Sequence, residues 1–240
     1  MFLWMLAVAF LVSSIGFKKY IWFISIGYGF SIAAIGAALL IAYGGTLTSG
    51  TAAACVLFVL YGCRLGGYLA FREFKVASYN AKMKTEIKDG ENMPFVAKCG
   101  IWSSSALLYA CETCPVLFRL ENGAGTDALL WCGVLLSACG LILESAADLQ
   151  KNAAKKRNVN RFVDTGLFRM VRCPNYFGEM LFWTGVFLGG LNILNGVWQW
   201  VAALLGYIGI IYVMFSGARR ISSVGGFLSL SSSPFRFFRA

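Results

Sequence analysis

Long apolar segments alternate with short polar ones along most of the chain. A helix needs about 20 residues to cross a hydrocarbon layer about 30 Å thick. Most of the apolar segments approach that length, and they fall at about residues 2–16, 20–43, 51–71, 100–118, 127–147, 176–193 and 196–216. The pattern predicts an all-α, polytopic integral membrane protein with about seven transmembrane helices, the first of them short.

The composition also indicates a membrane protein. With 58% hydrophobic and 13% charged residues and a mean hydropathy of +0.69, a chain of 240 residues cannot bury its apolar surface in one water-soluble core. The first apolar segment differs from a cleaved signal peptide, because Lys18 and Lys19 follow it and no small-residue cleavage site is present. We therefore expect this segment to remain as a helix.

Basic residues are distributed unevenly among the connections between the apolar segments. If the N-terminus lies outside, the inside segments hold Lys18, Lys19, residues 72–98, residues 151–172 and the C-terminal arginines, and only Arg119 lies in an outside loop. This asymmetry predicts an external N-terminus and a cytoplasmic C-terminus. The net charge of +10 then belongs to a cytoplasmic face suited to anionic lipids or an anionic cofactor. Nucleic acid is not an expected partner, because the basic residues are spread over several loops beside the membrane.

Around the start of the sixth apolar segment the chain reads DTGLFRMVRCPNYFGEMLFWTGVFLGG. Pro174 suits a first helical turn, because its missing N–H would be unpaired there. Asn175 and Glu179 share a face of that helix. Arg169 and Arg172 precede a helix N-terminus with free N–H groups, so the segment predicts an anion site at the membrane surface. Alternatively, the arginines are only topology signals and the carboxylate only complements the helix dipole.

Two other apolar segments carry polar stripes. Tyr61, Arg64 and Tyr68 follow i, i+3, i+7 spacing, so they share one face of the third helix. An arginine there normally faces a partner or a cavity, although Arg64 could also extend to the cytoplasmic surface. Glu144 and Asp148 are four residues apart and lie on one face of the fifth helix. These two acids could simply form an ion-pair network with the basic residues that follow them.

The eight cysteines do not predict a metal site. The Cys-x-x-Cys pair at Cys111 and Cys114 is isolated, and the chain has no histidine to complete a zinc site. The absence of histidine also excludes mechanisms that depend on a histidine base. Glu112, between these cysteines, is expected near the outer surface in a structural role.

The sequence GLFRMVRCPNYFGEMLFWTGVFL resembles the signature of the steroid 5-alpha-reductase-like family of membrane enzymes. In that family a Gly-Leu-aromatic turn leads into a Pro-Asn-Tyr-x-Gly-Glu step that opens a transmembrane helix. The likeness covers roughly residues 55–218 and includes Tyr61, Glu144 and Asp148. Isoprenylcysteine carboxyl methyltransferases and sterol reductases of the same superfamily share the step in a looser form.

The resemblance implies a catalytic domain over residues 1–218 that uses NADPH to reduce a carbon-carbon double bond conjugated to a ketone in a steroid-like or other lipid. It implies that Tyr61 is the acid at the substrate carbonyl and Arg64 its electrostatic helper. The cofactor site, on the cytoplasmic side, would be formed by Glu144, Asp148, Lys155, Arg161, Arg169, Arg172, Asn175, Tyr176 and Glu179.

The chain departs from the family pattern at three places. The second helix lacks a glutamate to partner the tyrosine, and Cys173 stands where many relatives have histidine. Residues 219–240 are rich in serine and glycine and are expected to be disordered or not native to the fold. Two alternatives stay open. One is an S-adenosylmethionine-dependent methyltransferase, which the basic loop disfavours because this cofactor carries no phosphate; the other is a non-catalytic membrane protein.

Overall fold

The computed structural model describes residues 1–75, 93–157 and 163–225, with side chains up to Ala218. Within this part of the chain every regular element is a helix, which confirms the all-α class. The elements are α1 (Phe2–Ser13), the 3₁₀ turns η1 (Ser14–Phe17) and η2 (Tyr20–Phe23), α2 (Ile26–Ala42), α3 (Ser49–Lys75), α6 (Phe95–Glu121), α7 (Ala128–Arg157), α8 (Leu167–Met170), α9 (Pro174–Gly190) and α10 (Gly196–Gly225).

Each of the predicted apolar segments contains a helix. Four stretches are long and apolar enough to cross a membrane, namely Tyr20–Ala42, Ser49–Lys75, Ala128–Arg157 and Gly196–Ala218. Two other helices are shorter or less apolar: α9 has 17 residues and is therefore only about 25 Å long, and the apolar stretch of α6 is interrupted by polar residues such as Ser103, Ser104 and Glu112. The chain is thus a membrane protein with several spanning helices, and the count of seven crossings stays a prediction.

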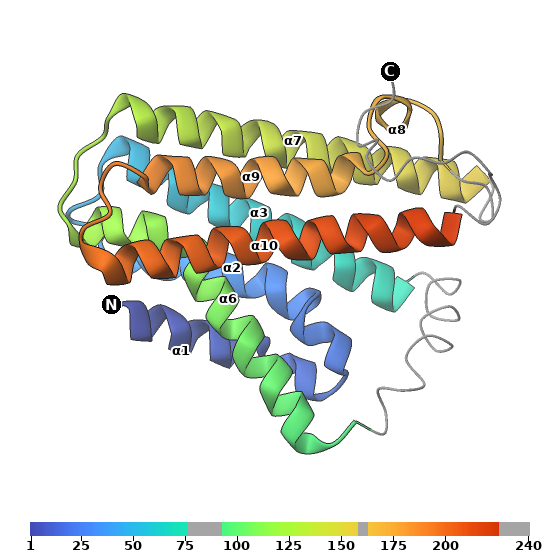
Figure 1. Ribbon diagram of the computed structural model, residues 1–240, viewed down its shortest axis with the longest axis horizontal. Helices are drawn as coiled ribbons and strands as arrows, with labels where there is room; N and C mark the ends of the chain where they lie inside the picture. The colour runs from blue at the N-terminus through green and yellow to red at the C-terminus, as the bar shows by residue number, and fades with distance from the viewer. Residues whose placement is uncertain (76–92, 158–162, 226–240) are drawn as a thin grey trace.

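Figure 1 shows that α3, α7, α9 and α10 extend along the long axis, while α1 and α6 cross more obliquely on the side where α2 lies. The N-terminus and the connections α2–α3, α6–α7 and α9–α10 lie at one end. The C-terminal ends of α3 and α7, the start of α9 and the short α8 lie at the other end. The last turns of α3 and α7 carry Arg72, Lys75, Lys155, Lys156 and Arg157, so basic residues gather at this second end.

Helices α7 and α9 form the most extensive helix pair, and glycines set their separation. A Cβ atom added at Gly178 would lie 2.6 Å from the Glu144 nitrogen, and one added at Gly140 would lie 2.5 Å from the Phe182 nitrogen. Small residues at such positions allow the backbones of membrane helices to approach closely. Gly178 of the Pro-Asn-Tyr-Phe-Gly-Glu step is therefore a packing residue that brings the start of α9 against α7.

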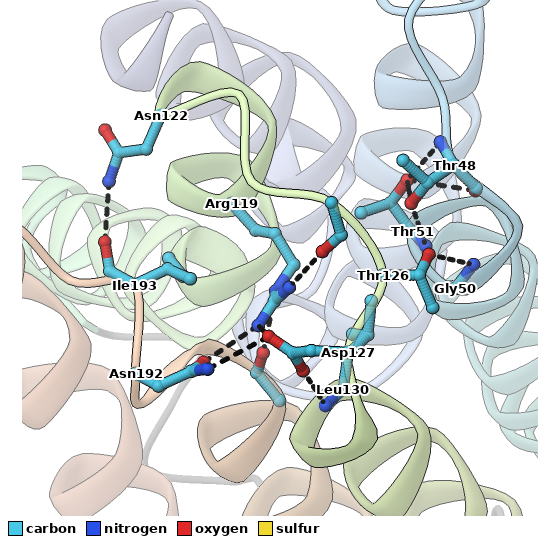
Figure 2. Close-up of polar contacts among 12 residues, drawn as sticks. Thr48, Gly50, Thr51, Arg119, Asn122, Thr126, Asp127, Leu130, Asn192 and Ile193 are labelled. Carbon is cyan, nitrogen blue, oxygen red and sulfur yellow. Dashed lines mark hydrogen bonds and ion pairs between the residues drawn. The ribbon is translucent and has the colours of Figure 1, made fainter.

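A buried arginine joins the helices at the end of the molecule that holds the N-terminus (Figure 2). Arg119 was expected in a loop, but it lies near the end of α6 with only 1% of its surface exposed. Its Nε donates to the Gly189 carbonyl at 3.0 Å, and a terminal nitrogen donates to the Gly125 carbonyl. The other terminal nitrogen donates to Asp127 and Asn192, each at 2.8 Å. Arg119 therefore links α6 to the connections before α7 and after α9.

Candidate functional site

Four side chains from three helices form a buried polar cluster, which we call the tyrosine–glutamate cluster: Tyr28 of α2, Tyr61 of α3, and Glu179 and Trp183 of α9. Tyr61 and Tyr28 both donate to Oε1 of Glu179, at 2.9 and 3.0 Å. Trp183 Nε1 donates to the Tyr28 hydroxyl at 2.8 Å, and the two tyrosine oxygens are 3.1 Å apart. All four side chains are buried, so this is a self-contained polar centre within an apolar bundle.

The local sequence of α9 explains its part of this cluster. The helix begins at Pro174, as predicted, so Glu179 lies in its second turn. Trp183 follows four residues later and projects from the same face. On the same helix, the Phe182 ring stacks on the Tyr61 ring with centroids 4.2 Å apart. Tyr61 is fully buried, so a substrate can reach its hydroxyl only after neighbouring side chains move apart.

The structure provides the acid partner of Tyr61 that the sequence left unassigned. The second helix lacks a glutamate, and Glu179 of α9 takes that position beside the tyrosine hydroxyl. Glu179 was predicted only as a cofactor ligand. Tyr28 and Trp183 were not predicted at all, although Trp183 follows Glu179 at helical i, i+4 spacing and Tyr28 is a polar side chain in an otherwise apolar segment.

A second carboxyl group lies beside the cluster. Glu112 of α6 was expected near the outer surface, but it is 3% exposed and faces Tyr28. Neither of its carboxyl oxygens has a hydrogen-bond partner of normal geometry within the described residues. Tyr109, one turn earlier, donates to the Phe23 carbonyl at 2.7 Å, and its ring lies 4.9 Å from that of Tyr28. Helix α6 therefore contributes an acid to the interior, contrary to the expectation from sequence.

Arg64, Glu144 and Asp148 form an ion cluster between α3 and α7. The two terminal nitrogens of Arg64 bind Glu144 Oε1 and Asp148 Oδ2, each at 2.5 Å. The hydrogen bonds of Arg64 go to Glu144 and Asp148 and not to Tyr61. Arg64 is nevertheless close enough to Glu179 to interact with it electrostatically. Any help that Arg64 gives Tyr61 therefore passes through the glutamate. Glu144 Oε2 is buried and has no hydrogen-bond partner among the described residues.

The other predicted cofactor residues lie near the end of the molecule where α9 begins. Lys155, Asn175 and Tyr176 are partly buried, and the Tyr176 ring lies beside Gly217 of α10. Arg169, in α8, and Arg172 are exposed. Arg161 lies outside the described residues.

This arrangement fits the chemistry of a phosphorylated dinucleotide. The exposed arginines precede a helix N-terminus, where anions are favoured, and the unpartnered Glu144 oxygen suits a hydroxyl donor such as a ribose. A small, partly open pocket of about 10 Å³ lies elsewhere, between residues such as Leu57, Val116 and Leu130. It is too small and too apolar to hold a molecule such as a dinucleotide.

These observations define an all-helical, multi-pass membrane protein with a tyrosine–carboxylate centre buried in its bundle. The chain belongs to the family described as "Protein of unknown function (DUF1295)", whose model matches residues 9–224. The match spans every segment on which the resemblance to steroid 5-alpha-reductase-like enzymes rests, and it extends into the first residues of the expected tail. No curated protein and no solved structure matches the chain.

Proposed function

We propose that this protein is a membrane-embedded reductase that uses NADPH to reduce a carbon-carbon double bond conjugated to a ketone in a steroid-like or other lipid substrate. The observation that carries the proposal is the hydrogen bond between Tyr61 and Glu179 inside the helical bundle. The resemblance of residues 55–218, with the Pro-Asn-Tyr-Phe-Gly-Glu step, to steroid 5-alpha-reductase-like enzymes also supports the proposal, and this stretch lies within the family match.

The reaction requires an acid at the substrate carbonyl, because negative charge develops on that oxygen as the double bond is reduced. The Tyr61–Glu179 pair has two proton arrangements. When Glu179 is ionised, Tyr61 donates its proton to the carboxylate. When Glu179 is protonated, the hydrogen bond reverses and the Tyr61 proton is free to point at a substrate carbonyl. The second arrangement makes Tyr61 the hydrogen-bond and proton donor to the substrate.

NADPH supplies a hydride when it is bound, and the residues near the start of α9 would hold it. Arg169 and Arg172 would neutralise phosphate charge, together with Lys155 of α7 and with Arg161. Glu144 and Asp148, already oriented by Arg64, would accept hydrogen bonds from ribose hydroxyls. Asn175 and Tyr176, in the first turn of α9, would complete the site that holds the cofactor.

We also propose that α1, α6 and α9 complete seven membrane crossings, with the cofactor end in the cytoplasm. The basic last turns of α3 and α7 support this orientation. A lipid substrate would then approach from the bilayer, while the charged cofactor would approach from water.

Mass spectrometry of the small molecules that copurify with the protein tests the cofactor directly, and titration with NADPH gives its affinity. We expect NADPH. Detection of S-adenosylmethionine would instead identify a methyltransferase, and the absence of binding to either compound would overturn an enzymatic function.

Replacement of Tyr61 by phenylalanine tests the acid. We expect Tyr61→Phe to bind NADPH normally and to lose about 10²-fold or more in turnover, the contribution typical of a positioned general acid. Tyr207→Phe is the matched control, because Tyr207 is paired with Thr184 outside the tyrosine–glutamate cluster. Equal turnover of both variants would contradict the assignment of Tyr61.

A further inference from the structure

We propose that Glu112 is a buried proton donor that resupplies Tyr61 through the hydroxyl of Tyr28. Glu112 is then a positioning residue, since it acts on the substrate only through the two tyrosines. The kinetic part of this inference rests on the proposed reductase function. The protonation of Glu112 itself does not depend on that function.

The contrast between two buried carboxyl groups supports the inference. Glu179 accepts hydrogen bonds from two tyrosines, which stabilise its ionised form. Glu112 is equally buried, but neither of its oxygens has a hydrogen-bond partner among the described residues. An ionised carboxylate without donors is very costly in an apolar interior, whereas the neutral carboxyl group is much less so. In the resting protein the proton of the pair therefore belongs on Glu112. In the arrangement that frees Tyr61 to donate to the substrate, Glu179 carries a second proton, so only Glu112 is ionised after the transfer.

Among the described residues, no basic side chain pairs with Glu112 to stabilise a charge. The titratable groups that interact with it are Tyr28 of α2, Glu179 of α9, and Tyr109 and Cys111 of its own helix. Helix α10 contributes the backbone of Gly206 against this part of α6. None of the ion pairs in the described part of the chain includes Glu112. Two acids that share such a site do not ionise together readily.

The Tyr28 hydroxyl lies between Glu112 and Tyr61 and is hydrogen-bonded to Tyr61. The Tyr28 hydroxyl is close enough to Glu112 to interact with its carboxyl group, although no hydrogen bond of normal geometry joins them. The same hydroxyl is 3.1 Å from the Tyr61 oxygen and is held in place by Trp183. The Glu112 proton can therefore reach Tyr61 through the Tyr28 hydroxyl, which its neighbours hold in place.

The proposed transfer conserves protons. After Tyr61 has given its proton to the substrate, its oxygen takes the proton of Tyr28. The Tyr28 oxygen then takes the proton of Glu112, whose O–H bond breaks. Glu112 is left as a carboxylate and regains its proton from water before the next turnover. No oxidant or reductant takes part in this transfer.

Infrared spectroscopy of the purified protein at neutral pH tests the protonation state without cofactor or substrate. We expect a carbonyl band of a protonated carboxyl group, shifted in D₂O and absent from Glu112→Gln. Glu121→Gln is the control, because Glu121 lies on the same helix but pairs with the N-terminal amine at 2.8 Å. A band that persists unchanged in a folded Glu112→Gln variant would overturn the inference.

If Glu112→Gln does not fold, the infrared test uses Tyr28→Phe instead. A band shifted by loss of the Tyr28 hydroxyl supports the inference, and an unshifted band overturns it.

Kinetics test the relay. We expect Glu112→Gln to bind NADPH like the parent but to lose roughly 10²-fold in turnover, the low end for a positioned proton donor. Glu112→Asp should recover part of that loss, because it restores the carboxyl group. A correct infrared result with parental turnover would refute the relay while leaving the reductase function intact. Absence of any NADPH-dependent activity in the parent would refute the reductase function while leaving the protonated Glu112 in place.

Discussion

Two glutamates in the same bundle have different surroundings, and these surroundings define different chemistry. Glu179 receives two hydroxyl donors and lies within electrostatic range of Arg64. Glu112 receives no hydrogen bond of normal geometry from the described residues. When two nearby acids lie in different environments, they differ in proton affinity, and this difference generally identifies which of them acts as acid and which as base. The pair therefore resembles an acid–base unit more than two independent structural residues.

Glu179→Gln should impair NADPH-dependent turnover much more than it impairs folding. Glutamine keeps the shape and one carbonyl acceptor for Tyr61 or Tyr28, but it removes the charge. Loss of a charge-assisted hydrogen bond costs on the order of 1.5–3 kcal/mol. Steady-state kinetics and NADPH titration, compared with thermal unfolding in detergent, measure the two effects. A variant that binds and oxidises NADPH like the parent would exclude Glu179 from the site.

Asp127 should make stability depend on pH in the acidic range. Partial burial alone would raise the pKa of this carboxyl group, but hydrogen bonds from Asn192, the Leu130 N–H and Arg119 outweigh it and lower the pKa from 3.8 to about 2. The charged form therefore stabilises the folded state above about pH 4, and this contribution is lost as the pH falls toward the folded-state pKa. Asp127→Asn should unfold at a lower temperature than the parent at neutral pH, and the difference should shrink near pH 2. A difference independent of pH would show that the charge is not responsible.

At the scale of helices, the sequence predicted where elements lie better than where they end. Apolar length located the helices, since burial in lipid requires continuous apolar residues. However, α6 begins earlier than predicted, at Phe95, and α7 and α10 continue to Arg157 and Gly225. Charged flanking residues keep helical structure outside the apolar region, so hydropathy marks the span and not the helix end.

In the candidate site, the sequence likewise predicted which residues share a face of one helix but not which helices contact each other. Helical spacing placed Tyr61 with Arg64, and Glu144 with Asp148, on common faces. In the structure Glu144 and Asp148 both bind Arg64, and Tyr61 and Arg64 both lie near Glu179. Helical spacing could not predict that these two faces meet, because the hydrogen bonds of Arg64 join residues 80 and 84 positions apart. The partner of Tyr61 is 118 positions away for the same reason. Packing between glycine-lined helices decides these contacts, and one sequence does not show which helices pair.

Gly178→Ala should separate α7 from α9 and disturb the site. The added Cβ would lie 2.6 Å from the Glu144 nitrogen and 2.8 Å from the Gly140 oxygen, and backbone atoms cannot rotate away. Overpacking of this kind typically costs about 1–3 kcal/mol. Gly67→Ala on α3 is the matched control, because nothing lies within 4 Å of its added Cβ and alanine favours a helix. Thermal unfolding in detergent should therefore show a lower midpoint for Gly178→Ala and an unchanged or higher one for Gly67→Ala; the reverse order would contradict the packing assigned to α7 and α9.

At the scale of the whole molecule, the two ends differ in how they use charge. At one end Arg119 is buried and satisfied by two carbonyl groups, Asp127 and Asn192, so it serves to join helices. At the other end the basic residues of the last helical turns include exposed side chains such as Lys156 and Arg157. Arg119, the arginine assigned to an outside loop, thus has a structural role, and the orientation stays a prediction.

Cysteine labelling in intact cells tests that orientation. Cys173 is buried and is a poor reporter, so we choose one position at each end of the molecule: Gly125, whose added Cβ contacts nothing within 4 Å, and the exposed Lys156. With the N-terminus outside, a membrane-impermeant maleimide should label Gly125→Cys in intact cells. It should label Lys156→Cys only after the membrane is permeabilised, because basic helix ends are retained in the cytoplasm. Each signal is compared with that of the parent, whose cysteines at 63, 132 and 139 are also exposed in the protein. The opposite pattern would place the proposed cofactor end outside the cell, where NADPH is not supplied, and would contradict the proposed function as well as the topology.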